Sequence, residues 1–293
     1  MKQRILTALV LLCIFVPTLI FSGTVAFPII AAVFCLAAVY EMLGCLGVRG
    51  SLFVAAPAYL LAALLPLGTM LIGGVGEGFA INLLKVEHSA AYLLIFGVCF
   101  VVYMFFLFAA AVFCRGKLSF SALASAFLTT FYITLAFTAI LLLRFGTNGQ
   151  YYYLLCFMGA WITDIFAYFT GYFFGKHKLI PEVSPKKTIE GSIGGILFCT
   201  ASFVLFGLIV GARIGSTPNY LVLGALGFLV SVLSQIGDLF ASLIKREHGM
   251  KDYSNIFPGH GGGMDRFDSV IATAPMLLIV CTLDAIFSLD LLL

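Results

Sequence analysis

Long apolar runs follow one another along this chain and are separated by short polar segments. A helix that crosses a membrane needs about 20 mostly apolar residues. Runs that meet this requirement lie at 5–22, 25–47, 52–73, 90–113, 119–142, 151–174, 192–212, 220–244 and 269–290. The pattern predicts an all-α, polytopic membrane helix bundle of about nine transmembrane helices.

The composition agrees with this prediction and excludes an ordinary soluble domain. Of the 293 residues, 62% are hydrophobic and 10% are charged, and the mean hydropathy is +1.14, whereas soluble proteins carry roughly 25% charged residues. The first run is longer than the roughly 7–15 apolar residues of a secretory signal, so we expect an uncleaved first span. The eight cysteines form no C-x-x-C pair and lie mostly in apolar runs, which indicates packing residues. We expect residues 1–293 to form a single integral membrane domain.

The basic residues indicate the orientation of the chain in the membrane. With nine spans, thirteen of the sixteen Lys and Arg residues fall at the N-terminus or in the loops after spans two, four, six and eight. The opposite side receives Lys85, Arg144 and Arg213. The positive-inside rule then places the N-terminus and the polar loops in the cytoplasm. The lack of a long polar N-terminal extension suits a bacterial plasma (inner) membrane.

The first of two polar regions extends over 164–191. A carboxylate at the centre of the bilayer costs about 2.5–3.5 kcal/mol on insertion scales, so Asp164 needs a reason for its position in an apolar run. Its spacing from Tyr168, Gly171 and Gly175 places all four residues on one helix face. Either the glycines permit close helix packing and Asp164 bonds a neighbouring polar group, or this face belongs to a functional site.

A short loop after this helix reads Ser184-Pro185-Lys186-Lys187-Thr188. It supplies two ammonium groups and two hydroxyl groups beside the membrane. Lysine acts as a mobile point charge on phosphoryl oxygens, so one interpretation is a phosphate cradle. The alternative is ordinary cytoplasmic charge that sets the topology.

The second polar region extends over 237–269, at the facing ends of the last two predicted spans. One helix face carries Asp238, Ser242 and Lys245, because Ser242 and Lys245 follow Asp238 by four and seven positions. Asp265 and Asp268 are three positions apart at the start of the last span. Proteins usually hold Mg²⁺ with one or two carboxylates and the phosphates of the substrate, so these helix ends suit a magnesium site. Helix caps and surface ion pairs are the alternative.

A glycine-rich loop, Gly259-His260-Gly261-Gly262-Gly263, lies between these carboxylates. Glycine lets backbone N–H groups approach an anion without interference from Cβ, but a glycine run by itself is more often a plain loop. His260 is either a hydrogen-bond donor or a proton donor to a leaving group. For His88, His177 and His248 the expectation is a solvated loop histidine.

Both regions resemble the motifs of the phosphatidate cytidylyltransferase (CDP-diacylglycerol synthase) family. The family pattern S-x-x-K-R-x4-K-D, followed by H-G-G-x-x-D-R-x-D, is matched by Ser242, Lys245, Arg246, Lys251, Asp252, His260, Gly261, Gly262, Asp265, Arg266 and Asp268. The region from Asp164 to Gly191 is similar to the family's D-x-x-A-Y-x-x-G-x-x-x-G and S-P-K-K-T-x-E-G segments. The motifs cover about the second half of the chain, and the first five spans match only in character. Ala241 stands where bacterial members often have Glu, which puts an essential role of that Glu in doubt.

The resemblance implies transfer of a cytidylyl group from CTP to phosphatidic acid by a nine-span membrane homodimer that depends on a divalent metal. It implies that Asp238 and Asp265 are ligands of Mg²⁺, with a second cation left open. Catalytic roles are expected for Asp238, Asp265, Lys251 and His260. Substrate contacts are expected for Asp164, Ser184, Lys186, Lys187, Thr188, Ser242, Lys245, Arg246, Asp252, Gly261, Gly262, Arg266 and Asp268. No nucleic-acid partner is expected.

Two other functions compete with this interpretation. A CTP-dependent lipid kinase would use similar loop chemistry but would transfer the γ-phosphate and release CDP. A secondary transporter would place its charged residues near the membrane midplane, often with repeat symmetry. Here the charges gather at one face and no internal repeat is evident.

Overall fold

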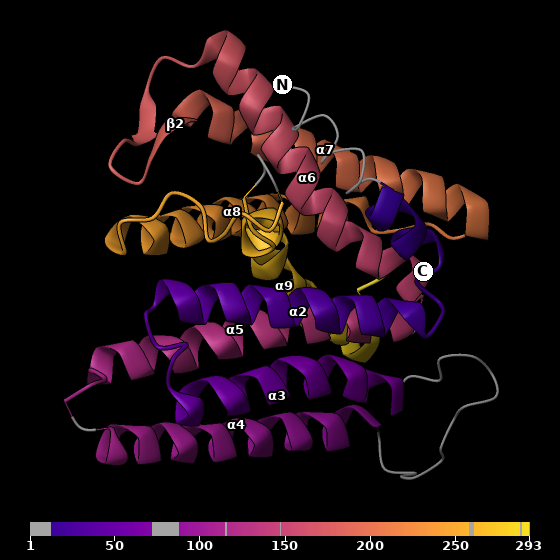
Figure 1. Ribbon diagram of the computed structural model, residues 1–293. Coiled ribbons are helices and arrows are strands. Elements are labelled where there is room, and N and C mark those ends of the chain that lie inside the picture. Colours follow the sequence, from indigo (N-terminus) through magenta and orange to yellow (C-terminus); the bar gives the residue numbers. More distant parts are fainter. Residues whose placement is uncertain are drawn as a thin grey trace. The chain divides into compact units, whose positions relative to one another are not determined.

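Helices make up nearly all of the regular structure of this chain (Figure 1). The computed structural model describes residues 13–71, 88–114, 116–146, 148–257, 261–287 and 289–292. Residues 13–20 are helical. The elements that follow are α2 (Ala26–Cys45), α3 (Leu52–Gly68), η1 (Thr69–Leu71), α4 (His88–Phe113), α5 (Phe120–Phe145), α6 (Gly149–Phe174), β1 (Lys178–Ile180), β2 (Ser184–Thr188), α7 (Ile189–Ile214), α8 (Tyr220–Glu247) and α9 (Met264–Phe287).

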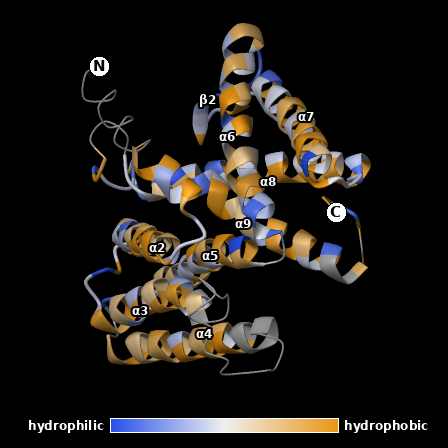
Figure 2. Cartoon of the chain, turned by 90° about the vertical axis from the view of Figure 1, so that its right-hand side faces the viewer, coloured by the Kyte–Doolittle hydropathy of each residue, from blue (hydrophilic) through white to orange (hydrophobic). Residues whose placement is uncertain are grey.

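The helices confirm the prediction of an all-α, polytopic membrane protein. Within the described residues, seven helices are long and apolar enough to cross a membrane, and α3 is a shorter apolar helix. Hydrophobic residues cover most of their length (Figure 2). Large apolar side chains of α4, such as Leu94, Phe105 and Phe113, are exposed, as expected for surfaces that face lipid rather than water.

Each predicted apolar run from 25–47 onward overlaps one of the helices α2–α9, but their limits differ where a helix extends beyond its apolar part. α9 begins at Met264 and not at residue 269, so it includes Asp265 and Asp268. α8 continues to Glu247 beyond the predicted end at 244. A hydropathy pattern locates the membrane-embedded part of a helix, whereas the helix itself ends where its terminal backbone groups find other partners.

The described residues group into two compact units. Unit 1 consists of Met1–Gly146 and His248–Arg266, and in it α2 packs against α3 and α5, while α4 packs against α3 and α5. Edge-to-face contacts of Phe100 with Phe127 and Phe131 fill the contact between α4 and α5. The Arg144 side chain donates from Nε to Ser22 Oγ at 2.8 Å. The expected single domain stays a prediction.

Unit 2 consists of Thr147–Glu247 and Phe267–Leu293, and its helices α6, α7 and α8 pack against one another. Polar side chains bond across the helices in its interior. Thr163 Oγ1 of α6 donates to Ser231 Oγ of α8 at 2.9 Å, and Gln235 Nε2 of α8 donates to the Ser192 carbonyl of α7 at 3.3 Å. Such bonds hold transmembrane helices together because lipid offers polar groups no other partner.

A small antiparallel hairpin connects α6 to α7, where the sequence led us to expect an irregular loop. β1 pairs with β2 in the register Lys178↔Thr188 and Ile180↔Ser184. The segment 184–188 is therefore a strand whose Lys186 is exposed and whose Thr188 is buried. Hydropathy could not reveal this hairpin, because its strands are too short and too polar to show an apolar alternation.

Glycines allow α6 and α7 to approach closely. A Cβ atom on Gly191 of α7 would lie 2.6 Å from the carbonyl oxygen of Ala167 in α6, and backbone cannot give way as a flexible side chain can. Gly191→Ala should therefore push the helices apart and destabilise the protein by roughly 1–3 kcal/mol. Thermal unfolding in detergent would measure the effect.

Gly224→Ala in α8 is the matched control for this variant. Its nearest neighbour would be Val204 Cγ2 at 3.6 Å, an ordinary contact. Since Ala is favoured over Gly inside a helix by roughly 0.5–1 kcal/mol, the melting temperature should stay the same or rise. Equal melting temperatures for the two variants would contradict the proposed close approach of α6 and α7.

Candidate active site

A carboxylate of α8 forms an ion pair with the hairpin inside unit 2. Lys187 Nζ, from β2, lies 2.6 Å from Asp238 Oδ2, and each side chain is 25% exposed. The Nζ atom itself is covered by the protein. One helical turn after Asp238, Ser242 donates from Oγ to Asp238 Oδ1 at 3.5 Å, so these two residues share a helix face as the spacing predicted. The structure thus joins the two polar regions of the sequence at Asp238.

Further acids gather around this pair. Ser269 of α9 donates from Oγ to Asp164 Oδ2 of α6 at 3.1 Å. The charges of Asp238, Asp164 and Lys245 all act on the neighbouring Asp268 carboxylate. Lys245, in the last turn of α8, is buried. Unit 2 therefore brings acids from α6, α8 and α9 within electrostatic reach of one another, together with the ammonium groups of Lys187 and Lys245.

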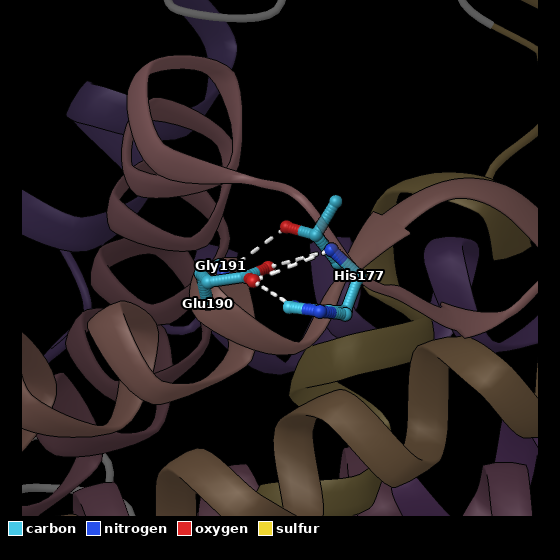
Figure 3. A network of polar contacts seen from close by, with 4 residues as sticks. His177, Glu190 and Gly191 are labelled. Atoms are coloured by element: carbon cyan, nitrogen blue, oxygen red, sulfur yellow. Dashed lines mark hydrogen bonds and ion pairs between the residues drawn. The ribbon is translucent and has the colours of Figure 1, made fainter.

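A contact between Glu190 and His177 joins the two ends of the hairpin. Glu190, in the first turn of α7, accepts from the His177 backbone N–H at 3.2 Å, and its Oε1 lies 2.6 Å from His177 Nδ1 (Figure 3). The His177 carbonyl in turn accepts from Ile189 N at 2.9 Å. His177 is a solvated loop histidine as expected, with 74% of its side chain exposed. Its pairing with Glu190 is an addition that depends on the hairpin, which returns the chain to its starting point.

Thr188 caps α7, the helix that follows the hairpin. Its Oγ1 accepts from Gly191 N at 3.1 Å, and its side chain is buried. A Cβ atom on either Gly171 or Gly175 would press against the Thr188 side chain. This geometry supports the packing interpretation of the two glycines. A substrate contact by Thr188 stays a prediction.

The glycine-rich loop of unit 1 is shaped by Asp265. Its Oδ2 accepts from the backbone N–H groups of Tyr253 and Gly262, each at 2.9 Å. Gly261 has a φ of +82°, and a Cβ atom there would lie 2.8 Å from Asp265 Oδ2. Only glycine adopts this backbone conformation without strain. Asp265 therefore organises its own loop, whatever else it binds.

Glu41 of α2 is the part of this loop structure that the sequence analysis missed. This buried residue accepts from Ser254 Oγ at 2.5 Å, from Gly263 N at 3.0 Å and from Met264 N at 2.8 Å. It is the one acid among residues 1–73 of the sequence. An isolated acid in an apolar run is a functional signal in its own right, and that signal was available before the structure.

The remaining predicted site residues lie near the ends of the helices or in the loops. Ser184 is half-buried, and Gly261 and Gly262 are buried. The exposed members are Lys186, Arg246, Lys251, Asp252 and Arg266. His260 lies outside the described residues.

The predicted magnesium ligands belong to different units, Asp238 to unit 2 and Asp265 to unit 1. Their joint binding of one ion stays a prediction. In the part of the chain that the structure describes, no three His, Cys, Asp or Glu side chains form a group that could hold a metal ion. A site that takes one or two carboxylates from the protein and the rest from substrate phosphates does not need such a group.

Comparison with known proteins adds independent information. The defining pattern of the "Cytidylyltransferase family" matches residues 2–284. The chain is 34% identical over 281 residues to the phosphatidate cytidylyltransferase of Staphylococcus aureus (strain COL), which covers 96% of this chain and 98% of that protein. It is 43% identical over 143 residues to the phosphatidate cytidylyltransferase of Aquifex aeolicus, which covers 48% of this chain and 51% of that protein. The enzyme of the same name from Staphylococcus haemolyticus is 32% identical over 280 residues, 96% of this chain and 98% of that protein.

Proposed function

The chain belongs to the cytidylyltransferase family and transfers a cytidylyl group from CTP to phosphatidic acid in phospholipid biosynthesis, and we propose that the charged residues around Asp238 form the centre of that reaction. The observation that carries this proposal is the ion pair between Asp238 and Lys187. It joins the two motif regions, which lie far apart in the chain.

The reaction places a particular demand on this centre. A phosphate oxygen of phosphatidic acid attacks the α-phosphorus of CTP, a new P–O bond forms, and the bond between the α- and β-phosphates breaks to release pyrophosphate. The attacking oxygen is already ionised near neutral pH and needs little help from a base. Phosphoryl-type transfer depends mainly on positioning and on neutralisation of charge, so two polyanions must be brought together among cations.

The residues of unit 2 supply such cations at fixed places. Lys187 reaches Asp238 from the hairpin, and the buried Lys245 acts on Asp268 from α8. Their sequence neighbours, Lys186 before Lys187 and Arg246 after Lys245, are exposed and add mobile positive charge. We assign Lys187 and Lys245 to the phosphates of the nucleotide, with Asp238 holding the Lys187 ammonium in place before CTP arrives.

The same group of residues fits a divalent cation. Asp238 already has a cationic partner in the Lys187 ammonium, and the carboxylates of Asp164 and Asp268 lie within electrostatic range. These acids outnumber the two ammonium groups, so an additional cation would balance the charge. In this proposal Asp238 and Asp265 would be the ligands of Mg²⁺, and the ion would supply positive charge next to the phosphates of CTP.

We also propose an arrangement in the membrane and an oligomeric state. The charge asymmetry supports a cytoplasmic N-terminus with cytoplasmic catalytic loops, in a bacterial plasma membrane. This orientation gives the site access to aqueous CTP and to a lipid substrate at the bilayer surface. The family resemblance supports a homodimer.

Product analysis tests the proposed reaction directly. Purified protein in detergent, supplied with labelled CTP and phosphatidic acid, should release pyrophosphate and form a CDP-lipid. A CTP-dependent lipid kinase would instead transfer the γ-phosphate and release CDP. A transporter would form neither product, and its signal would be uptake into vesicles.

Removal of divalent metal should abolish activity. A chelator in excess over Mg²⁺ should reduce cytidylyl transfer to background, and millimolar-range Mg²⁺ should restore it, because a site with few carboxylates binds Mg²⁺ weakly. The measurement is pyrophosphate release against free Mg²⁺. Full activity in chelator would exclude the metal while leaving the ion-pair site intact.

A further inference from the structure

We infer that Glu41 is a positioning residue for cytidylyl transfer, which holds the glycine-rich loop and the first turn of α9 in their active arrangement. The inference rests on the proposed role of this loop and of Asp265. The loop lies more than two hundred residues from Glu41 in the sequence, with separations of 222 and 223 residues for the two backbone contacts.

The contacts of Glu41 gather on the start of α9. Gly263 N and Met264 N are among the first backbone donors of the helix, which have no partner inside the helix itself. Glu41 Oε1 accepts from Gly263 N at 3.0 Å and Oε2 from Met264 N at 2.8 Å. A negative side chain is favourable there because the N-terminus of a helix carries partial positive charge. Glu41 thus caps α9 from another helix.

A third bond ties the same carboxylate to the loop before α9. Ser254 Oγ donates to Glu41 Oε1 at 2.5 Å, and Ile256 N donates to Ser254 Oγ at 3.2 Å. Glu41 therefore joins the segment just after Tyr253 to the segment just before Asp265. Those are the two places where Asp265 also bonds the loop, at Tyr253 N and Gly262 N. Two carboxylates from different helices hold one loop between them.

Steric contact makes the arrangement tighter. A Cβ atom on Gly262 would lie 2.6 Å from Glu41 Cδ. The Glu41 carboxylate therefore occupies the space of the missing side chain, and a larger residue at either position would displace the other. An apolar residue at 41 would leave backbone donors unbonded in a buried place, which is costly. The Glu41 side chain therefore fills the space next to Gly262 and also accepts the hydrogen bonds of the buried backbone donors.

The functional consequence concerns Asp265 and Arg266, which follow the capped turn directly. Their positions depend on where α9 begins and on the path of the loop. Mutation of a residue that hydrogen-bonds to a metal ligand and orients it typically lowers metal affinity or activity roughly 10–100-fold. Glu41 acts on the reaction through these neighbours and is expected to touch neither substrate.

Glu41→Gln is the sharpest test, since it keeps the size of the side chain. Glutamine has one acceptor oxygen and one NH₂ group, so one of the backbone N–H groups would face another donor. We expect kcat for cytidylyl transfer to fall roughly 10–100-fold, while KM for CTP and the yield of folded protein in detergent stay close to those of wild type. Unchanged kcat would overturn the inference.

Two further variants keep the test decisive. Ser22→Ala removes a partly buried hydrogen bond with Arg144 elsewhere in unit 1 and should leave kcat unchanged. Should Glu41→Gln fail to fold, Ser254→Ala removes one bond to the same carboxylate together with the bond from Ile256 N, and it should lower kcat by about fivefold. Wild-type kcat for Ser254→Ala would then contradict the role.

A double-mutant cycle separates positioning from general stability. Glu41→Gln and Gly262→Ala disturb the same contact, so their effects on kcat should be less than additive when combined. Fully additive effects would indicate unrelated damage and would overturn the inference. The proposed function is tested separately: if Asp265→Asn is fully active, the proposed metal role of Asp265 fails, whereas an inactive Asp265→Asn with a normal Glu41→Gln refutes only the positioning role.

Discussion

Asp238→Asn is expected to lower cytidylyl transfer by roughly 10²–10³-fold or more, the range seen when one preorganised electrostatic group is lost from an active site. Asparagine can still accept the bond from Ser242, which now reaches Asp238 Oδ1 at 3.5 Å. It loses the negative charge that pairs with Lys187 at 2.6 Å and the charge that would bind a cation. Initial rates of pyrophosphate release at saturating CTP would measure the loss.

The control for this variant is Asp284, an acid of unit 2 that lies near the C-terminal end of α9. Asp284 accepts from the Tyr152 hydroxyl at 2.8 Å and from Leu291 N at 3.2 Å. Asp284→Asn also removes one carboxylate charge, and it should keep wild-type kcat. Near-normal activity of Asp238→Asn would exclude both the ion-pair site and the metal role of Asp238.

Asp265 shapes its loop and is proposed to bind a metal ion, and a pair of variants distinguishes the two roles. Asp265→Asn keeps an oxygen that can accept from Tyr253 N and Gly262 N, which both now bond Oδ2 at 2.9 Å, so the loop should keep its path. It removes the charge that a metal needs. We expect a loss of roughly 100-fold or more in kcat, with hydrogen exchange of the loop amides unchanged.

Asp265→Ala removes both the charge and the loop bonds. It should be at least as inactive as Asp265→Asn, and its loop amides should exchange faster because they lose their acceptor. An active Asp265→Asn together with an inactive Asp265→Ala would mean that Asp265 only shapes the loop. The magnesium proposal would then have to rest on unit 2 alone.

Much of this protein could be predicted from local features of its sequence. The apolar runs located the helices because burial in lipid depends on the composition of each segment by itself. The four-residue spacing of Asp238 and Ser242 placed them on one helix face, and the structure confirms this by a direct contact. The motif spacings were enough to indicate the family, which the comparisons confirm over nearly the whole chain.

The pairings between distant segments were decided only by the tertiary structure. The contact of Lys187 with Asp238, that of Asp164 with Ser269 and the cap that Glu41 places on α9 each join residues on separate elements. Their spacing in the chain carries no information about these contacts, because they form only when whole helices pack. The helix period orders residues within a helix, but the packing of side chains and glycines decides which helix faces meet. For this reason the candidate acids could be identified from the sequence, while their partners could not.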